Sequence, residues 1–443
     1  MDIGAGTTDV MIAAYKNENE TKNKDSNSQC ILTPVPLFWE SFYFAGDDLM
    51  KQLIQQLVIE GQHSPLEKRL RELGKNPVEI LQPFLGTDNG VSFRNRQLRS
   101  DFNLQISVPV VSYYLELLKQ NSDDKILSYG DIFGTNSPTQ TVLQHFQNSF
   151  GFDFTSVQWT YKKKFVSDIV EKTFDSLIGK ISSLLSYYAC DIVLLSGRPT
   201  SLKPLTDLFL KYYAISPNRL KSMNDYRVGR WYPEDKRYPY IDGNGKFLNP
   251  KSIITTGAMI GHLAENGLNG FSLNLSELKA KLLPTTSYFG KLNEETLEYL
   301  DTIISPDKNH DVVQVPSLPF RIGVRQLDIE AYPSRPFYTL DYNDYKIEDR
   351  VRGRLPDEPT QNEVEQGIRA EKEKIRKGMP LNITIERDVN DDIEKLNLVE
   401  ITDKDGNTLN AKFFTLQVQS MSEVENFWLD SGIFSLNINN SQN

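Results

Sequence analysis

The sequence predicts an α/β fold that is followed by a small β-rich module. A glycine-rich loop, Gly4-Ala5-Gly6, follows Asp2-Ile3 near the start of the sequence, and a short apolar run, residues 10–15, comes after it. Residues 192–195 form another apolar stretch, which continues through a Ser-Gly turn into an amphipathic helix. After residue 379 the apolar residues alternate with the period of β-strands. Strands and helices therefore alternate over most of the chain, and strands alone are expected at its end.

The composition is that of a folded protein with one large core or two to three ordinary ones. The 443 residues are 39% hydrophobic, and a domain usually takes roughly 100–200 residues. The net charge of −10 argues against general binding to nucleic acid or to anionic membranes. We expect a soluble protein of a reducing, cytoplasmic compartment, without the stretch of about 18–20 apolar residues that spans a bilayer. The two cysteines and four histidines of the sequence show neither the spacing of a disulfide framework nor that of metal ligands. They are Cys30, Cys190, His63, His145, His262 and His310.

The stretch "MDIGAGTTDV" predicts a phosphate cradle. Its two glycines can adopt positive φ, which lets backbone N–H groups face an anion, and its two threonines add hydroxyl donors. Two aspartates bracket the loop. From the residues alone an ordinary hairpin turn is the alternative, because glycine-rich turns are common. The candidate site residues are Asp2, Gly4, Gly6, Thr7, Thr8 and Asp9.

Two further stretches extend this pattern. In "FAGDDLMKQLIQQL", Gly46 is predicted to form a turn and Asp47 to cap a helix with one apolar face. In "DIVLLSGRPTSLKPLTDLFLKYY", a buried strand is expected over residues 192–195, and a ligand can approach the turn at Gly197 closely. The later stretch "TTGAMIGHL" predicts a helix whose small residues, Gly257 and Gly261 among them, allow another backbone to pack tightly.

These motifs occur in an order that resembles the ATPase superfamily of actin, heat-shock chaperones and sugar kinases. The resemblance implies the second half of a ribonuclease-H-like fold, with "DIGAGTTDV" as the second phosphate loop and "LLSGRPTSL" as the adenosine loop. It implies ATP and Mg²⁺ as cofactors. Asp2 and Asp9 would be the catalytic carboxylates, and Asp2 would act on the metal through a bound water. By the same resemblance, the residues around the phosphates would be Gly4, Gly6, Thr7 and Thr8, and those facing the nucleoside would be Gly197 and Arg198.

Within that superfamily, roughly residues 1–345 resemble the virulence-factor SrfB-like proteins. The strings "SGRPTSL", "YRVGRWYP", "NPKSIITTGA" and "PFRIGVRQLDIEAYPSRPFYTL" carry this likeness, in that order. Those proteins are bacterial and much longer. The resemblance therefore implies a C-terminal portion, whose partner would be a missing N-terminal ATPase half or an upstream-encoded subunit.

The first phosphate loop of such ATPases, of the type Asp-x-Gly-Thr/Ser, has no clear match. The nearest strings, "DGNGK" and "KDGNT", are each predicted to be a polar turn between extended segments. Phosphoryl transfer needs positioning and charge stabilisation from several sides, so the chain alone is expected to be catalytically incomplete. The alternative is a non-catalytic scaffold that keeps the actin-like shape and binds protein partners.

The chain is predicted to divide into an actin-like half and three smaller parts. Residues 1–270 form that half, with an inserted helical subdomain over about 47–122, and residues 271–345 form a mixed extension packed on it. The charge-dense residues 346–378 are predicted to form a solvated helical spacer. Residues 379–443 are predicted to form the β-rich module, with Phe427 and Trp428 in its core.

Two basic stretches have alternative interpretations. The run Lys162-Lys163-Lys164 could contact phosphate or RNA, but a solvated helix start is favoured. The stretch "RVGRWYPEDKRYPY" could stack bases or receive a peptide, whereas the favoured interpretation is a loop packed over the nucleotide half. Its cationic residues are Arg227, Arg230, Lys236 and Arg237.

Overall fold

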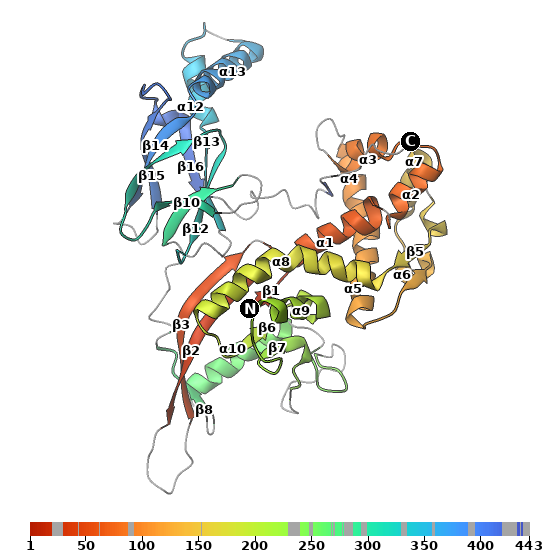
Figure 1. The fold of residues 1–443 in the computed structure, drawn as a ribbon. Helices are drawn as coiled ribbons and strands as arrows, with labels where there is room; N and C mark the ends of the chain where they lie inside the picture. The colour runs from red at the N-terminus through yellow and green to blue at the C-terminus, as the bar shows by residue number, and fades with distance from the viewer. Residues whose placement is uncertain are drawn as a thin grey trace. The chain divides into compact units, whose positions relative to one another are not determined.

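The structure is a computed structural model that divides into two compact units (Figure 1). The first unit comprises Met1–Leu37, Tyr43–Ala280 and Glu425–Asn443, and the second comprises Phe38–Phe42 and Lys281–Val424. The structure describes residues 1–19, 30–42, 44–61, 63–86, 93–151, 153–228, 240–247, 251–266, 268, 271–276, 278, 287–293, 299–328, 335–356, 359–388, 395–418, 432–434 and 436.

A sheet near the N-terminus organises the first unit. Its strands lie in the order β1 (Asp2–Ile3), β2 (Thr8–Asn19), β3 (Cys30–Phe42) and β8 (Phe271–Leu273). β1 is antiparallel to β2, and β8 is parallel to β3.

A second pair of strands continues this sheet past β1. β6 (Val193–Leu195) and β7 (Leu220–Ser222) are parallel to one another. Ser196, directly after β6, forms a parallel bridge with Asp2. The strands thus continue in the order β8-β3-β2-β1-β6-β7. β6 differs from the buried strand that its sequence predicts, because only Val193 and Leu195 are buried and Leu194 is 53% exposed.

The region predicted to be a helical subdomain is mainly helical, and its helices continue beyond residue 122. Its core includes a cluster of aromatic rings in which the ring of Phe146 contacts those of Phe102, Phe150 and Phe154. Two π-helical segments, Gln55–Ile59 and Asn103–Ser107, adjoin its α-helices. The α-helices are α1 (Gly46–Ile54), α2 (Pro65–Glu72), α3 (Pro77–Leu85), α4 (Phe93–Phe102), α5 (Val108–Lys119), α6 (Tyr129–Phe133) and α7 (Gln140–Phe150).

One long helix leads from this subdomain to β6. An antiparallel pair of strands, β4 (Lys125–Leu127) and β5 (Trp159–Tyr161), lies ahead of this helix, which is α8 (Lys163–Tyr187). The lysine run is a helix start, as favoured from the sequence: Asp124 accepts a hydrogen bond from the Lys163 backbone N–H and forms a 3.1 Å ion pair with Lys162. The helices that accompany β6 and β7 are α9 (Lys203–Tyr212) and α10 (Lys251–Glu265).

In its described residues, the second unit contains two antiparallel sheets and two α-helices. The five-stranded sheet has the order β10 (Tyr299–Ile304), β9 (Tyr288–Leu292), β12 (Phe320–Arg325), β13 (Arg335–Tyr342) and β16 (Phe414–Val418). The three-stranded sheet has the order β11 (His310–Val315), β14 (Leu381–Asp388) and β15 (Lys395–Thr402). The helices are α12 (Asp344–Arg352) and α13 (Gln361–Lys377).

Residues 281–424 belong to one unit, whereas the sequence predicted an extension, a spacer and a separate β-module there. β11 pairs with β14 and β13 pairs with β16, so strands on either side of residues 346–378 share their sheets. The helices between them are not a solvated spacer, because Ile347 and Ile375 belong to the same buried core as Ile322 and Ile383. In the sequence, the many charged residues of these helices obscure the few apolar residues that pack into this core.

The predicted turns in the polar strings are present. Asp242 accepts hydrogen bonds from the backbone N–H groups of Asn244 and Lys246 in "DGNGK", and Gly406 has a φ of +82° in "KDGNT". The strand predicted in "GIFSLNI" is not seen in its described residues. Phe434 instead donates its N–H to the carbonyl of Leu85 in the first unit, at 2.8 Å. Phe427 and Trp428 lie outside the described residues.

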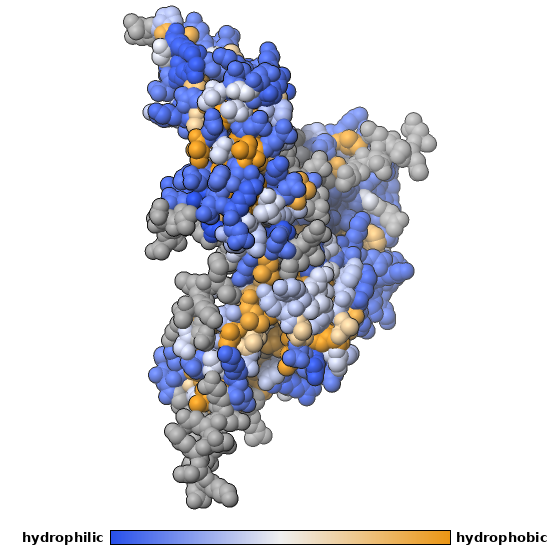
Figure 2. Space-filling model, turned by 60° about the vertical axis from the view of Figure 1, so that its left-hand side comes forward, coloured by the Kyte–Doolittle hydropathy of each residue, from blue (hydrophilic) through white to orange (hydrophobic). Residues whose placement is uncertain are grey.

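The surface is mainly hydrophilic on the face that Figure 2 shows, where apolar residues form smaller groups. None of the helices in the described part of the chain is long and apolar enough to cross a membrane.

Candidate functional site

The predicted phosphate loop is a tight turn between β1 and β2. The register of these strands places Asp2 directly opposite Asp9. The Gly4 N–H donates to the carbonyl of Thr7 at 2.8 Å, and the Thr7 hydroxyl donates to Asp9 Oδ2 at 3.2 Å. The two carboxylates are therefore cross-strand neighbours at the base of the loop.

The N-terminus of α1 lies against this loop. The N–H of Gly46 donates to the carbonyl of Gly4 at 3.1 Å, and the N–H of Asp47 donates to that of Ala5 at 2.8 Å. A Cβ on Gly46 would lie only 2.9 Å from the Gly4 oxygen, so this approach requires glycine. Burial raises the pKa of the Asp47 carboxyl above its ordinary value.

These contacts differ from the predicted turn and cap. Gly46 is the first residue of α1 rather than a turn residue, and the N-cap is Ala45, whose N–H donates to the Asp48 carboxylate at 2.8 Å. Asp47 lies inside the first turn. Sequence reasoning missed its contact with the loop, although a glycine followed by acidic residues at a helix start was the available signal.

The turn after β6 joins the same site. Gly197 has φ +91° and ψ +159°, a backbone conformation that is essentially restricted to glycine. A Cβ at this position would lie 1.9 Å from the carbonyl oxygen of Ile3. The N–H of Ile3 donates to the carbonyl of Ser196 at 3.0 Å. The structure therefore brings together two of the motifs that the sequence singled out.

Some donors of the loop are available to a ligand. The backbone N–H groups of Ala5 and Gly6 have no acceptor within the described part of the chain. A Cβ on Gly6 would meet no heavy atom within 4 Å, so the space beside it is open. Arg198 is exposed next to Gly197. An anion could therefore reach two N–H groups and a cationic side chain.

Thr8 departs from its predicted role as a phosphate contact. Its side chain is fully buried, and its hydroxyl donates to the carbonyl of Phe44 at 2.6 Å. The reason is the two-residue period of β2, which places Thr8 on the same buried face as Val10 and Ile12. Thr7, one position earlier, keeps its hydroxyl at the loop.

Asn224 supports the Gly197 turn from the loop after β7. Its amide donates to the Gly197 carbonyl at 3.1 Å and to the Thr200 hydroxyl at 3.0 Å. The Thr200 hydroxyl in turn donates to the Gly197 carbonyl at 2.8 Å. No local pattern in the sequence marks Asn224, because its partners come from another segment.

Other predicted functional features are not gathered at this site. In the basic stretch "RVGRWYPEDKRYPY", Arg230, Lys236 and Arg237 lie outside the described residues, and Arg227 lies on the loop after β7. Within the described ranges, no group of three or more His, Cys, Asp or Glu side chains is arranged to hold a metal ion directly.

Comparison with known families decides the relationship of this chain. The family model described as Virulence factor SrfB matches residues 1–435. The chain belongs to the SrfB virulence factor family. No curated protein and no solved structure gives a significant match to it. In this SrfB family member, the matched residues include both the loop after β1 and the turn at Gly197.

Proposed function

We propose that this chain binds Mg·ATP at the site formed by the loop after β1 and the turn after β6, as one half of an actin-like ATPase. The observation that carries the proposal is the approach of Gly197 to Ile3, where a Cβ would lie 1.9 Å from the Ile3 oxygen. β1 and the end of β6 run parallel, so both turns follow the carboxyl ends of neighbouring strands. In open α/β sheets, ligands bind at this edge.

The residues present fit a nucleotide phosphate. The N–H groups of Ala5 and Gly6 would donate to phosphate oxygens, with the N-terminus of α1 close behind the loop. Arg198 would approach from the other turn. Asp2 would accept hydrogen bonds from water on a bound Mg²⁺, which would supply charge neutralisation for the phosphates.

The strand order supports the same fold. The order β3-β2-β1-β6-β7, with β2 antiparallel to β1 and with β6 and β7 parallel to one another, agrees with a ribonuclease-H-like half. The described residues offer these phosphate contacts from one side only. Because phosphoryl transfer needs charge stabilisation from several sides, we propose that hydrolysis requires a second body that supplies the first phosphate loop.

Titration calorimetry with Mg·ATP tests nucleotide binding. The open space at Gly6 allows a matched pair of variants, Gly6→Glu and Gly6→Gln, which have similar size and differ in charge. We expect Gly6→Glu to bind about tenfold more weakly than Gly6→Gln, a difference of about 1.4 kcal/mol, because its carboxylate repels phosphate. Circular dichroism checks that both variants fold.

The opposite results would favour the scaffold function. If the unaltered chain shows no heat of binding at millimolar Mg·ATP, this site is not a nucleotide site. Equal affinities of the Glu and Gln variants would show that nucleotide binds elsewhere on the chain.

A further inference from the structure

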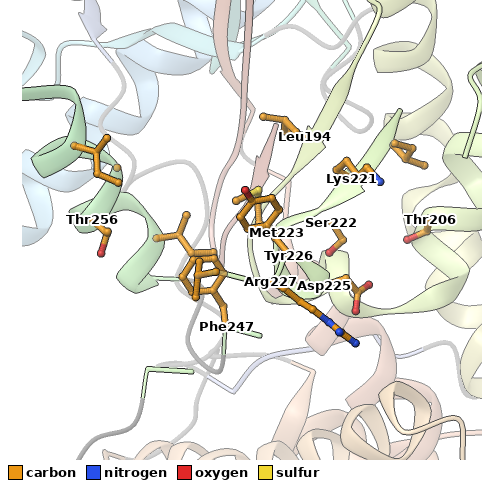
Figure 3. Close-up of a pocket in the computed structure, with 15 residues that line it drawn as sticks. Leu194, Thr206, Lys221, Ser222, Met223, Asp225, Tyr226, Arg227, Phe247 and Thr256 are labelled. Carbon is orange, nitrogen blue, oxygen red and sulfur yellow. The ribbon is translucent and has the colours of Figure 1, made fainter. Parts of the chain in front are cut away.

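A cavity of about 740 Å³ lies between the strand pair β6–β7 and helix α10 in the first unit. Figure 3 shows its lining residues. Its volume is within the range of small-molecule sites, which is roughly 300–1,000 Å³. The apolar part of its wall includes Leu194, Met223, Phe247, Ile253 and Ile260.

The charged residues of the wall lie at one side of the cavity. In Figure 3, Lys221, Ser222 and Asp225 lie on one side of Met223 and Tyr226, and Phe247 and Thr256 lie on the other. Lys221 and Arg227 also line the cavity, and both are exposed. A ligand with two chemically different ends would match this arrangement.

Two of the charged residues that line the cavity, Lys221 and Arg227, are cationic. The Asp225 carboxylate also lines the cavity, and it forms a 2.8 Å ion pair with Lys246. Asp242, whose pKa is lowered first by a hydrogen bond from the Lys246 backbone N–H, also interacts electrostatically with Arg227. Among the described lining residues there are thus two cationic side chains and one carboxylate that is already ion-paired, and an anionic group of a ligand would balance the cations.

Helix α10 forms one wall of the cavity, and there is open space beside two of its glycines. A Cβ added at Gly257 would meet no heavy atom within 4 Å, and the same is true of Gly261. Only Gly257 lines the cavity. The predicted role of these glycines, close packing of another backbone, is therefore not what the structure has, and at Gly257 the missing side chain enlarges the cavity.

We propose that this cavity binds an amphiphilic organic anion, with its hydrocarbon body against Phe247 and α10 and its anionic group near Lys221 and Arg227. The site is separate from the phosphate loop and does not rest on nucleotide binding. Its apolar wall offers hydrocarbon contacts where a purine edge would need several hydrogen-bond partners.

Two fluorescent probes with one ring system test the proposal. The anion 1-anilinonaphthalene-8-sulfonate carries the sulfonate that N-phenyl-1-naphthylamine lacks. We expect saturable binding of one molecule of the anionic probe per chain. Gly257→Met would occupy the part of the cavity beside α10 and should weaken both probes about tenfold, because its side chain competes with the hydrocarbon body for that space. Gly261→Met, on the same helix but outside the cavity, should leave both affinities unchanged.

A second variant tests the charged side independently of packing. The exposed pair Lys221→Gln and Arg227→Gln should weaken the anionic probe about threefold to fivefold and leave the neutral probe unchanged. Equal losses for both probes would overturn the assignment of the anionic end. The proposal also fails if Gly257→Met keeps its affinity, if Gly261→Met loses as much, or if Mg·ATP displaces the anionic probe competitively.

Discussion

Replacing Gly197 with alanine should sharply destabilise the first unit. The added Cβ would lie 1.9 Å from the Ile3 oxygen, whereas real Cβ contacts are essentially never under 3.0 Å, so β1 and the turn must separate by at least the 1.1 Å difference. The backbone conformation at Gly197 costs a non-glycine residue about 1–3 kcal/mol. Separation also threatens the hydrogen bonds Ile3 N–H to Ser196 O and Ser196 N–H to Met1 O, each worth about 1 kcal/mol.

Together these losses amount to about 4 kcal/mol, which is a large part of a typical domain stability of about 5–15 kcal/mol. The measurement is urea unfolding followed by circular dichroism at 222 nm. Gly74→Ala is the matched control, because Gly74 also has positive φ, +69°, but an added Cβ there meets no heavy atom within 4 Å. We expect this control to cost about 1 kcal/mol.

The comparison separates close approach from backbone strain. If Gly197→Ala and Gly74→Ala lower the unfolding free energy by similar amounts, the turn after β1 and the turn after β6 are not in direct backbone contact. The proposed site would then lose the observation on which it depends. A large loss at Gly197 alone would support the approach that the structure contains.

Three further changes test other parts of the chain. Gly367→Ala would place a Cβ 2.4 Å from Val351 Cγ1 and should cost about 1–3 kcal/mol in urea unfolding; adding Val351→Ala should recover part of this loss, since neighbouring substitutions are not additive. Burial raises the folded-state pKa of Asp47, so the unfolding free energy of the unaltered chain should fall as pH rises through the titration of this carboxyl. Asp47→Asn should make that fall smaller, which urea midpoints near pH 4 and pH 7 would measure. Trypsin should spare α13 and release no folded fragment starting at Met379, because β14 pairs with β11; an early cut within α13, found by mass spectrometry, would contradict this.

Local features of the site were predictable because glycine positions and strand period act over a few residues. The turn at Gly4 and the turn at Gly197 follow from sequence alone. Their contact does not, because it depends on β6 lying next to β1, and the intervening helical subdomain carries no signal for that pairing. Asn224 was missed for the same reason. Thr8 was misassigned although its strand period was readable, since the loop motif was followed one residue too far.

The division of the second unit was not predictable from local pattern. The pairing of Tyr342 with Phe414 and of Val315 with Leu381 spans the charge-dense helices, and such long-range pairs leave no trace in periodicity. One helical spacer was predicted across the charge-dense residues 346–378, where the structure has the two helices α12 and α13. Their buried residues, Ile347 and Ile375, are few among many charged neighbours, so the apolar stripe that docks them was not weighed.

Glycine shows most clearly where sequence reasoning stops. Gly46 and Gly197 are required because another backbone lies where their side chains would be. Gly6 and Gly257 have open space at the same position, and both lie at sites where we propose that a ligand binds. All four positions are glycine in the sequence, and only the neighbouring atoms in the structure distinguish close packing from open space. A substitution at Gly46 or Gly197 should therefore lower the free energy of unfolding. A substitution at Gly6 or Gly257 should leave the chain folded and weaken ligand binding.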